Sequence, residues 1–298
     1  MKQSVELIDA LNKTFGAHKS YRASHAKGFT VRGHFLPALE QSGLQIPLLE
    51  GKQPVVARFS VGGGKPGISD KSPTVRGFGL EIGTGTEAWV MALISNPVFF
   101  ANSAEQFKAF LAARAPDPAT GAPNPAKVQA FNAANPNTIP HQAYLKSVAP
   151  CRCYSAEAYH SGHAYQFQVD GEPLFARVKL EPEGGRIGLS DEEMQNLSDD
   201  FLYDRMVRVL MDGSAVWSLK LLVATEGDEV GDPTVPWLEE KTELLLGRIQ
   251  INLPDDRAES LRRVFDPAQM PQGVDAPLDQ VFDLRSMAYA ESYRRRNL

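Results

Sequence analysis

Hydrophobic residues recur along this chain with two different periods. Residues 4–15 (SVELIDALNKTF) carry apolar side chains at helical spacing and predict an N-terminal amphipathic helix. From residue 54 onward, runs rich in β-branched and aromatic residues predict strands. These runs are PVVARFSV, TVRGFGLEI, EAWVMALI, HAYQFQV, EPLFARVKL, AVWSLKLLVA and LLLGRIQINL. Six to eight such strands indicate an antiparallel barrel.

The segments outside the strands predict helices and surface connections. Residues 16–35 (GAHKSYRASHAKGFTVRGHF) are punctuated by glycine, and we expect an extended, irregular course there. Residues 103–115 predict a helix, and the Pro-, Ala- and Asn-rich residues 115–140 predict a surface connection. Residues 190–211 predict an acidic helix with an N-terminal cap, and the last twenty residues end in a predicted basic helix.

Composition narrows the function classes. The chain has 298 residues, of which 43% are hydrophobic, and the same strand pattern flanks residues 115–140, so we expect a single domain over residues 1–298. Positive and negative charges are interspersed, with a net charge of −5, which argues against a nucleic-acid partner. No apolar run reaches the roughly 20 residues of a membrane helix, and the polar start is unlike a signal peptide. These features predict a cytoplasmic protein without a membrane partner.

Two sequence features could be taken for a metal site or a phosphate-binding loop, but their residue spacing does not fit either. Cys151 and Cys153 are too few for a four-cysteine metal site and too close together for an easy disulfide, so we expect free thiols. The glycines at 62–64 lack a following Lys-Ser/Thr pair, so they predict a turn and not a phosphate-binding loop.

Two segments contain candidate catalytic side chains. His25 lies in RASHAKG, where small neighbours allow the backbone to approach another group closely, although a single histidine is more often a surface or core residue. Near the C-terminal end, RSMAYAESYRRR places Arg285 one helical turn before Tyr289. Read from composition alone, that helix is equally a solvated basic face.

Four segments in sequence order resemble the haem catalases. They are RASHAKG, RFSVGGGKPGISDKSPTVRGFGLEI, NPVFFANSAEQFKAFL and RVFDPAQMPQGVDAPLDQVFDLRSMAYAESYRRRNL. The last contains FDP-x-x-MP-x-G, a phrase typical of that family, and matches its pattern of an arginine, a tyrosine and a further arginine at Arg285, Tyr289 and Arg296. The resemblance implies an α+β fold with an antiparallel eight-stranded β-barrel and flanking helices. It also implies a haem b cofactor.

The resemblance assigns a role to each matching residue. Tyr289 would be the axial iron ligand, and the neighbouring guanidinium of Arg285 favours its phenolate form. Tyr293 is the rival ligand, but it lacks arginines at the family spacing. On the other face of the haem, His25 would be the acid/base that cleaves peroxide, and Ser60 would hold its imidazole. The residues expected to contact the haem or its propionates are Arg22, Arg58, Arg296 and, as a residue that also suits core packing, Phe107.

Two departures from full-length catalases affect the predicted activity. Ile94 occupies the position of the family's distal asparagine, three residues before the Pro-Val-Phe-Phe phrase. The resemblance also covers only the catalase core, as in the short catalase-related peroxidases. Both features favour a peroxidase that uses a small organic electron donor with peroxide as substrate, has weak catalase activity and forms a homodimer.

Three other activities remain compatible with the resemblance. A slow catalase would dismutate hydrogen peroxide, and an isomerase would convert fatty-acid hydroperoxides without an external reductant. A haem sensor or storage protein would have no enzymatic activity. Retention of His25 together with Ser60 argues against that last class, because haem binding alone needs no distal base.

Overall fold

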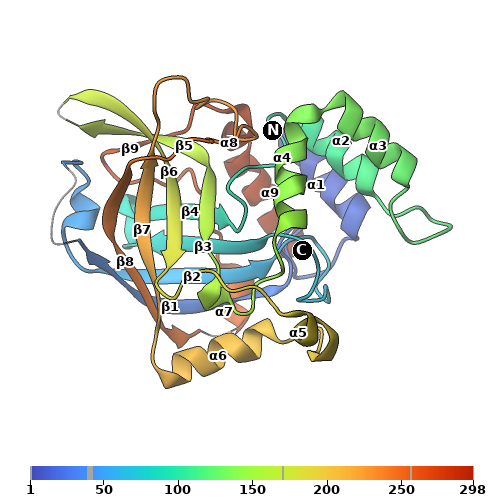
Figure 1. Ribbon diagram of the computed structural model, residues 1–298, viewed down its shortest axis with the longest axis horizontal. Helices are drawn as coiled ribbons and strands as arrows, with labels where there is room; N and C mark the ends of the chain where they lie inside the picture. Colours follow the sequence, from blue (N-terminus) through green and yellow to red (C-terminus); the bar gives the residue numbers. More distant parts are fainter. Residues whose placement is uncertain (1, 39–42, 170, 256, 298) are drawn as a thin grey trace.

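The structure is a computed structural model that describes residues 2–38, 43–169, 171–255 and 257–297. Within these residues, eight antiparallel strands follow one another in the order β4-β3-β2-β1-β8-β7-β6-β5, and the pairing of β4 with β5 closes them into a barrel (Figure 1). A short strand, β9, continues the pairing beyond β5. The strands are β1 (Gly28–Pro37), β2 (Gln53–Val61), β3 (Arg76–Ile82), β4 (Trp89–Ile94), β5 (Tyr159–Val169), β6 (Glu172–Pro182), β7 (Ala215–Val223), β8 (Glu243–Pro254) and β9 (Val274–Asp275).

Aromatic side chains fill the inside of the barrel. Phe59, Phe78 and Trp217 are fully buried, and the ring centroids of Phe59 and Phe78 lie 4.7 Å apart. Successive side chains of a strand point to opposite faces of the sheet. The neighbours of these core residues, among them Ser60 and Gly77, therefore face outward from the barrel, toward the helices and loops that cover it.

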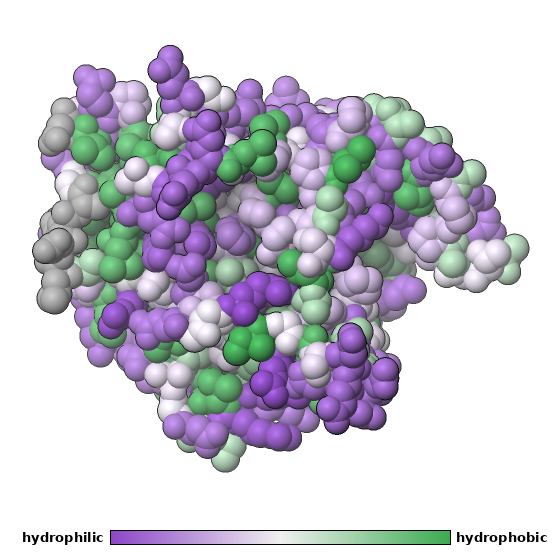
Figure 2. Space-filling view, viewed as in Figure 1, coloured by the Kyte–Doolittle hydropathy of each residue, from purple (hydrophilic) through white to green (hydrophobic). Residues whose placement is uncertain are grey.

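Five helices gather on one side of the barrel (Figure 1). α1 contacts both α2 and α9, so segments from the two ends of the described chain lie together. Two more helices, α5 and α6, cover another face, and the surface view shows hydrophilic residues gathered over α5 (Figure 2). The five are α1 (Lys2–Phe15), α2 (Ala104–Arg114), α3 (Pro125–Ala134), α4 (Ile139–Ser147) and α9 (Arg285–Arg296); the two others are α5 (Asp191–Asn196) and α6 (Leu202–Asp212).

Short helical segments connect these elements. They are η1 (Pro47–Glu50), η2 (Gly85–Glu87), η3 (Pro136–Thr138), η4 (Tyr154–Ala156), α7 (Arg257–Arg262) and α8 (Gln280–Asp283). In the part of the chain that the structure describes, no helix is long and apolar enough to cross a membrane. Both cysteines are buried free thiols, as the sequence predicts.

Three sequence expectations need correction. Residues 16–27 are irregular as expected, but Gly28–Pro37 form strand β1, which pairs with β2 and β8 on either side. Two glycines and a proline weaken the strand signal there, and the two neighbouring strands override it. Residues 115–140 contain α3 and the start of α4. The sequence does contain a start signal for α3, because the capping residue Asn124 is followed by a proline.

The third correction concerns residues 190–211. They form two helices instead of one, although Ser190 caps the first with a capping box as expected. In the interruption between Asn196 and Leu202, Asp199 bonds to the loop that precedes β3 through both its carbonyl and its carboxylate, and Asp200 pairs with Lys27. The hydrophobic spacing is helical both before and after this break, so the sequence pattern predicts one continuous helix.

Candidate functional site

His25 lies in the irregular segment just before β1 and is held in an unusual backbone conformation. Its backbone φ angle is +53°, in the left-handed region that residues other than glycine rarely adopt. Holding a residue there costs about 1–3 kcal/mol of conformational energy. Its Nδ1 lies 2.9 Å from the hydroxyl oxygen of Ser60 on β2. Within the described residues, its other ring nitrogen, Nε2, makes no hydrogen bond to the protein.

Gly77 provides the space for this pair. It is the cross-strand partner of Ser60, and a Cβ atom at position 77 would lie 2.4 Å from the Ser60 Oγ and 2.6 Å from the His25 Nδ1. Both contacts are far shorter than a carbon atom tolerates. Glycine at this position is therefore required by the close approach of the imidazole to β3.

The electrostatic surroundings keep His25 neutral. Burial lowers the pKa of its imidazole to about 3, and the positive charges of three arginines act in the same direction. The imidazole can therefore accept a proton at neutral pH without already carrying one. The three arginines are Arg58, Arg285 and Arg22.

Arg22, Arg58 and Arg296 form a cluster of guanidiniums around the segment 260–263; we call it the arginine cluster. Arg22 donates to the carbonyl oxygens of Ser260 and Arg263, both at 2.6 Å. Arg58 donates to the hydroxyl of residue 260 and to the carbonyl of residue 26. Arg296 donates to the carbonyls of residues 261 and 263. Arg58 and Arg296 are both less than a tenth exposed.

The arginine cluster lacks internal charge compensation. Burial, followed by the charges of Arg58 and Arg296, lowers the pKa of Arg22 to about 7. Burial likewise lowers the pKa values of Arg58 and Arg296, each to about 10. Among the described residues, none of the three forms an ion pair with a carboxylate, so their only hydrogen-bond acceptors are neutral oxygens. Such a cluster is suited to bind anionic groups of a ligand.

Tyr289 and Arg285 lie one turn apart on α9. The Arg285 Nη2 donates to the Tyr289 Oη at 3.4 Å. Burial alone lowers the pKa of Arg285, but the nearby phenol groups, with that of Tyr289 first, outweigh it and the pKa is raised. Arg285 is therefore a permanent cation that hydrogen-bonds to the phenol oxygen of Tyr289.

The structure adds two residues that the sequence reasoning missed, His163 and Asp279. Arg285 Nη1 lies 2.7 Å from the His163 Nε2, and the His163 Nδ1 lies 2.6 Å from a carboxylate oxygen of Asp279. Because a guanidinium only donates, Nε2 is the acceptor, and Nδ1 carries the proton that it donates to Asp279. His163 is therefore a neutral imidazole, in agreement with a pKa that burial lowers.

The His25 segment and α9 are in direct contact. The backbone N–H of Ala23 donates to the Ser292 Oγ at 3.4 Å. Phe107 on α2 packs against a small apolar cluster that includes Ala23, with Ala288 of α9 packed against the same cluster. The structure thus brings the sequence-predicted residues near one another. Arg58, Arg285 and Arg22 are close enough for their charges to act on His25, which bonds to Ser60, and Tyr289 is close enough to act on Arg22. Phe107 packs against the same apolar cluster as Ala288 of α9.

Ile94 lies on the same row of outward-facing positions as Ser60 and Gly77. It is the cross-strand partner of Gly77 and is 8% exposed, so its side chain lies on the His25 side of β4. Asn96 is fully buried, and its amide accepts from the Val98 N–H and donates to the carbonyl of residue 141. Asn96 therefore does not replace the family asparagine at this site.

Comparison with known proteins identifies the family. A family model described as Catalase matches residues 2–297. A catalase-related peroxidase of Synechococcus elongatus is 30% identical over 299 residues, covering 98% of this chain and 88% of the relative. A catalase-related peroxidase of Mycolicibacterium paratuberculosis is 28% identical, covering 98% of this chain and 94% of the relative.

Solved structures agree at the level of the fold. Catalase A from Saccharomyces cerevisiae superposes with a TM-score of 0.83 at 21% identity, over 98% of this chain and 64% of its own. A bacterial catalase gives a TM-score of 0.83 at 20% identity, over 98% of this chain and 60% of its own. This chain therefore spans about three fifths of the length of these catalases.

Proposed function

The chain belongs to the catalase family, and we propose that it is a haem-dependent peroxidase that reduces hydrogen peroxide or organic hydroperoxides with a small organic electron donor. One observation carries this proposal: a neutral His25, fixed by Ser60, lies in the same region as a tyrosine paired with a partly buried arginine. The proposal includes haem b as the cofactor, one haem-binding domain over residues 1–298 and a homodimer. A family match over residues 2–297 supports the single domain.

The arginine cluster fits the charge of haem. Haem b carries two propionates, and a buried carboxylate is stabilised by a hydrogen-bonded cation. Arg22, Arg58 and Arg296 have no carboxylate partner among the described residues, and mutual repulsion contributes to the low pKa of Arg22. Two anionic groups placed there would remove that repulsion, so these arginines are the residues proposed to hold the propionates.

Tyr289 is the residue proposed to hold the iron. A phenolate is a hard anionic ligand that stabilises ferric iron, and tyrosine is a known haem ligand in catalases. Arg285 donates to its oxygen, and the neutral His163 keeps that guanidinium oriented while Asp279 fixes the imidazole. When bound, haem supplies the redox chemistry of the reaction.

The protein's own part in peroxide cleavage is a proton transfer by His25. With Nδ1–H donated to Ser60, the lone pair of Nε2 is free to take the proton from the proximal peroxide oxygen. The same nitrogen would then return the proton to the distal oxygen. With two electrons supplied by the haem, the O–O bond would break and this oxygen would leave as water instead of hydroxide. Because its pKa is low, the imidazole begins neutral, with Nε2 carrying no proton.

A screen of peroxide and donor pairs tests the proposed function. Haem-loaded protein is expected to oxidise phenolic or other small organic donors in the presence of peroxide, faster than it evolves oxygen from hydrogen peroxide alone. Rapid oxygen evolution without a donor would instead identify a catalase. Conversion of lipid hydroperoxide without a donor would identify an isomerase, and no reaction with any peroxide would identify a haem-binding protein.

The Ile94→Asn variant is expected to evolve more oxygen from hydrogen peroxide. Dismutation needs a second hydrogen peroxide to be oriented near the haem, whereas a donor can deliver electrons from the haem edge. An amide at position 94 would supply an oriented hydrogen bond worth about 1–3 kcal/mol, or roughly 5- to 150-fold in rate. The measurement is an oxygen-electrode assay beside a donor-oxidation assay, both normalised to haem content.

Ile94→Val is the matched control, because it keeps the position apolar and removes one methylene. We expect its oxygen evolution to equal that of the wild type. If Ile94→Asn is folded and haem-loaded yet gains no oxygen evolution, Ile94 does not limit dismutation.

Gly77→Ala is expected to retain haem and to lose much of the first reaction with peroxide. The added methyl group would displace either the Ser60 hydroxyl or the His25 imidazole, and a displacement of about 1 Å can cost roughly 100-fold in rate. Stopped-flow mixing of the haem protein with peroxide measures this rate. Gly67→Ala is the control, because a Cβ there meets nothing within 4 Å. Wild-type kinetics in Gly77→Ala would show that the imidazole position is not critical.

A further inference from the structure

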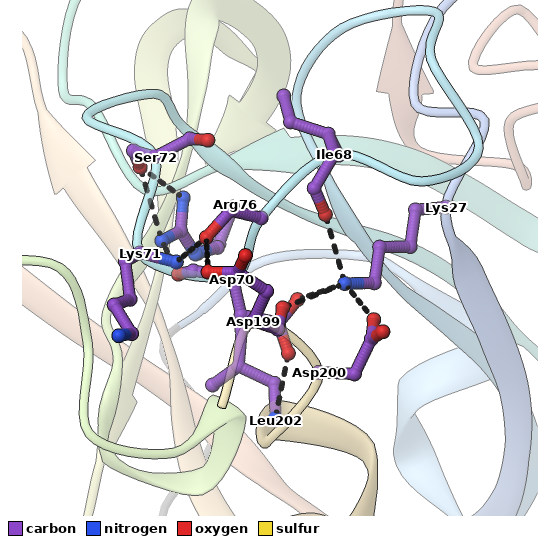
Figure 3. Close-up of polar contacts among 10 residues, drawn as sticks. Lys27, Ile68, Asp70, Lys71, Ser72, Arg76, Asp199, Asp200 and Leu202 are labelled. Atoms are coloured by element: carbon purple, nitrogen blue, oxygen red, sulfur yellow. Dashed lines mark hydrogen bonds and ion pairs between the residues drawn. The ribbon is translucent and has the colours of Figure 1, made fainter. Parts of the chain in front are cut away.

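Lys27 lies two residues after His25 and is the centre of an ion-pair network apart from the arginine cluster (Figure 3). Its ammonium group forms an ion pair with Asp70 at 2.7 Å and a second one with Asp200. It also donates to the carbonyl oxygens of Ile68 at 2.8 Å and Asp199 at 3.2 Å. One ammonium group thus joins the His25 segment to the loop before β3 and to the interruption between α5 and α6.

Asp70 is the fixed point of this network. Its residue is 1% exposed, and one carboxylate oxygen accepts the backbone N–H of Leu202 at the start of α6 at 2.8 Å. Its own backbone N–H donates to the carbonyl of Asp199 at 2.8 Å. Because both its carboxylate and its backbone N–H are hydrogen-bonded, Asp70 has a fixed position. The ion pair with Asp70 therefore fixes the position of the Lys27 ammonium group.

The network leads back to the imidazole of His25. The guanidinium of Arg76, which is 1% exposed, donates to the carbonyl of Asp70 at 2.6 Å (Figure 3). Arg76 is the first residue of β3, and the next residue is Gly77, which abuts the His25 Nδ1 and the Ser60 Oγ. A closed ring of contacts therefore runs from His25 through Lys27, Asp70 and Arg76 to Gly77, and back to His25.

His25 needs such support because few other contacts fix it. It has a φ of +53°, and residues 16–27 form no helix or strand. Near His25 the backbone is held by the Ala23 N–H, which donates to the Ser292 Oγ at 3.4 Å, and from residue 26 onward by bonds to β2 and the turn that follows it. The Ala26 N–H donates to the Gly63 carbonyl and the Lys27 carbonyl accepts from the Val61 N–H, both at 3.1 Å. Without the Lys27 tie, the segment could relax toward a more favourable backbone conformation and carry the imidazole away from β3.

We propose that Lys27 is a positioning residue for His25: its ion pair with buried Asp70 holds the imidazole against Ser60 and Gly77 at the geometry required for proton transfer. This inference rests on the proposed function of His25 as the distal acid/base. Lys27 acts by positioning His25 and not by shifting the pKa of its imidazole. The charges that lower the pKa of His25 belong to Arg58, Arg285 and Arg22, and Lys27 is not among them.

The test compares three variants of the haem-loaded protein. Lys27→Met keeps an unbranched side chain and removes the ammonium group, whereas Lys27→Arg keeps a cation that can reach Asp70. Lys71→Met is the matched control: Lys71 follows Asp70 in the same loop, and its ammonium group points away from the network (Figure 3).

Two rates are measured in each variant, the reaction with peroxide and the binding of cyanide to the ferric haem. Hydrogen cyanide is neutral at pH 7 and must lose a proton to bind iron, so the rate of cyanide association reports the position of the distal base without catalysis. We expect Lys27→Met to slow both rates by about 10- to 100-fold at unchanged haem content. Lys27→Arg should restore both rates toward the wild type, and Lys71→Met should leave both unchanged.

Further comparisons separate the possible failures. If His25→Ala does not slow cyanide binding, the role proposed for His25 is wrong. If His25→Ala slows it and Lys27→Met does not, only the positioning role of Lys27 is refuted. Should Lys27→Met fail to fold, Asp70→Asn removes the charge on the other side of the pair while retaining an oxygen for the Leu202 N–H. Wild-type rates in that variant would overturn the proposal, and a joint loss of both rates would support it.

Discussion

The Tyr289→Phe variant is expected to fold but to lose ferric haem during purification. Phenylalanine preserves the ring on α9 and removes only the oxygen that receives the Arg285 hydrogen bond. Loss of a residue in the outer shell of a metal site typically weakens binding by about 10- to 100-fold, and loss of the ligand itself should cost at least as much. The measurement is the haem absorbance relative to protein, before and after passage over a haem scavenger such as apomyoglobin.

Tyr293→Phe is the control for this experiment. Tyr293 lies on the same helix one turn further on, is 38% exposed and contacts the Arg296 guanidinium through its ring, 4.8 Å away, which phenylalanine retains. We expect wild-type haem content. A wild-type haem spectrum in Tyr289→Phe, or haem loss confined to Tyr293→Phe, would refute Tyr289 as the ligand.

The His25→Ala variant is expected to bind haem normally and to react with peroxide about 10²- to 10⁴-fold more slowly, the range for a positioned acid/base. Haem retention should survive because Tyr289 and the arginine cluster are untouched. The wild-type rate should be constant from pH 5 to 8, since a pKa near 3 leaves the imidazole neutral throughout. Stopped-flow absorption spectroscopy over this pH range measures both effects.

His18→Ala serves as the control, since His18 belongs to the same irregular segment, is exposed, and its imidazole bonds to the carbonyl of Phe15, a contact apart from Ser60 and Gly77. Its peroxide kinetics should match those of the wild type. Unchanged kinetics in His25→Ala would eliminate His25 as the proton carrier. A rate that falls with a pKa near 6.5 would contradict its low pKa.

The alternation of hydrophobic residues predicts most of the barrel strands, because each strand places every second side chain in the core. Residues 54–61 alternate between the aromatic core and the outer face, as Phe59 and Ser60 illustrate. The sequence pattern does not predict β1, because this strand depends on its pairing with β2 and β8 in the assembled sheet. The sequence pattern does not predict the break between α5 and α6 for the same reason, since Asp200 pairs with Lys27 and Asp199 accepts from Ser69 only in the folded chain.

The site was predictable only where residue types follow a recognisable local spacing. Arg285 and Tyr289 are one turn apart on a helix, and their relation is visible in the sequence. His163 and Asp279 are far apart in the chain, and each has an ordinary local interpretation: a histidine within a strand and the cap of a short helix. Their joint action on Arg285 follows from the packing of β5 against the segment before α9.

The arginine cluster joins segments that are distant in sequence, because Arg22 and Arg296 share the carbonyl of residue 263 as an acceptor. Hairpin pairings such as β2 with β3 and β5 with β6 close short loops, whereas this cluster requires the two ends of the described chain to meet. Contacts of large sequence separation pay a greater loop-closure entropy, so they tend to form late in folding. A ligand that binds only the completed cluster then draws the folding equilibrium toward the native state by mass action. If the proposed haem is that ligand, it would stabilise only chains whose two ends have already come together.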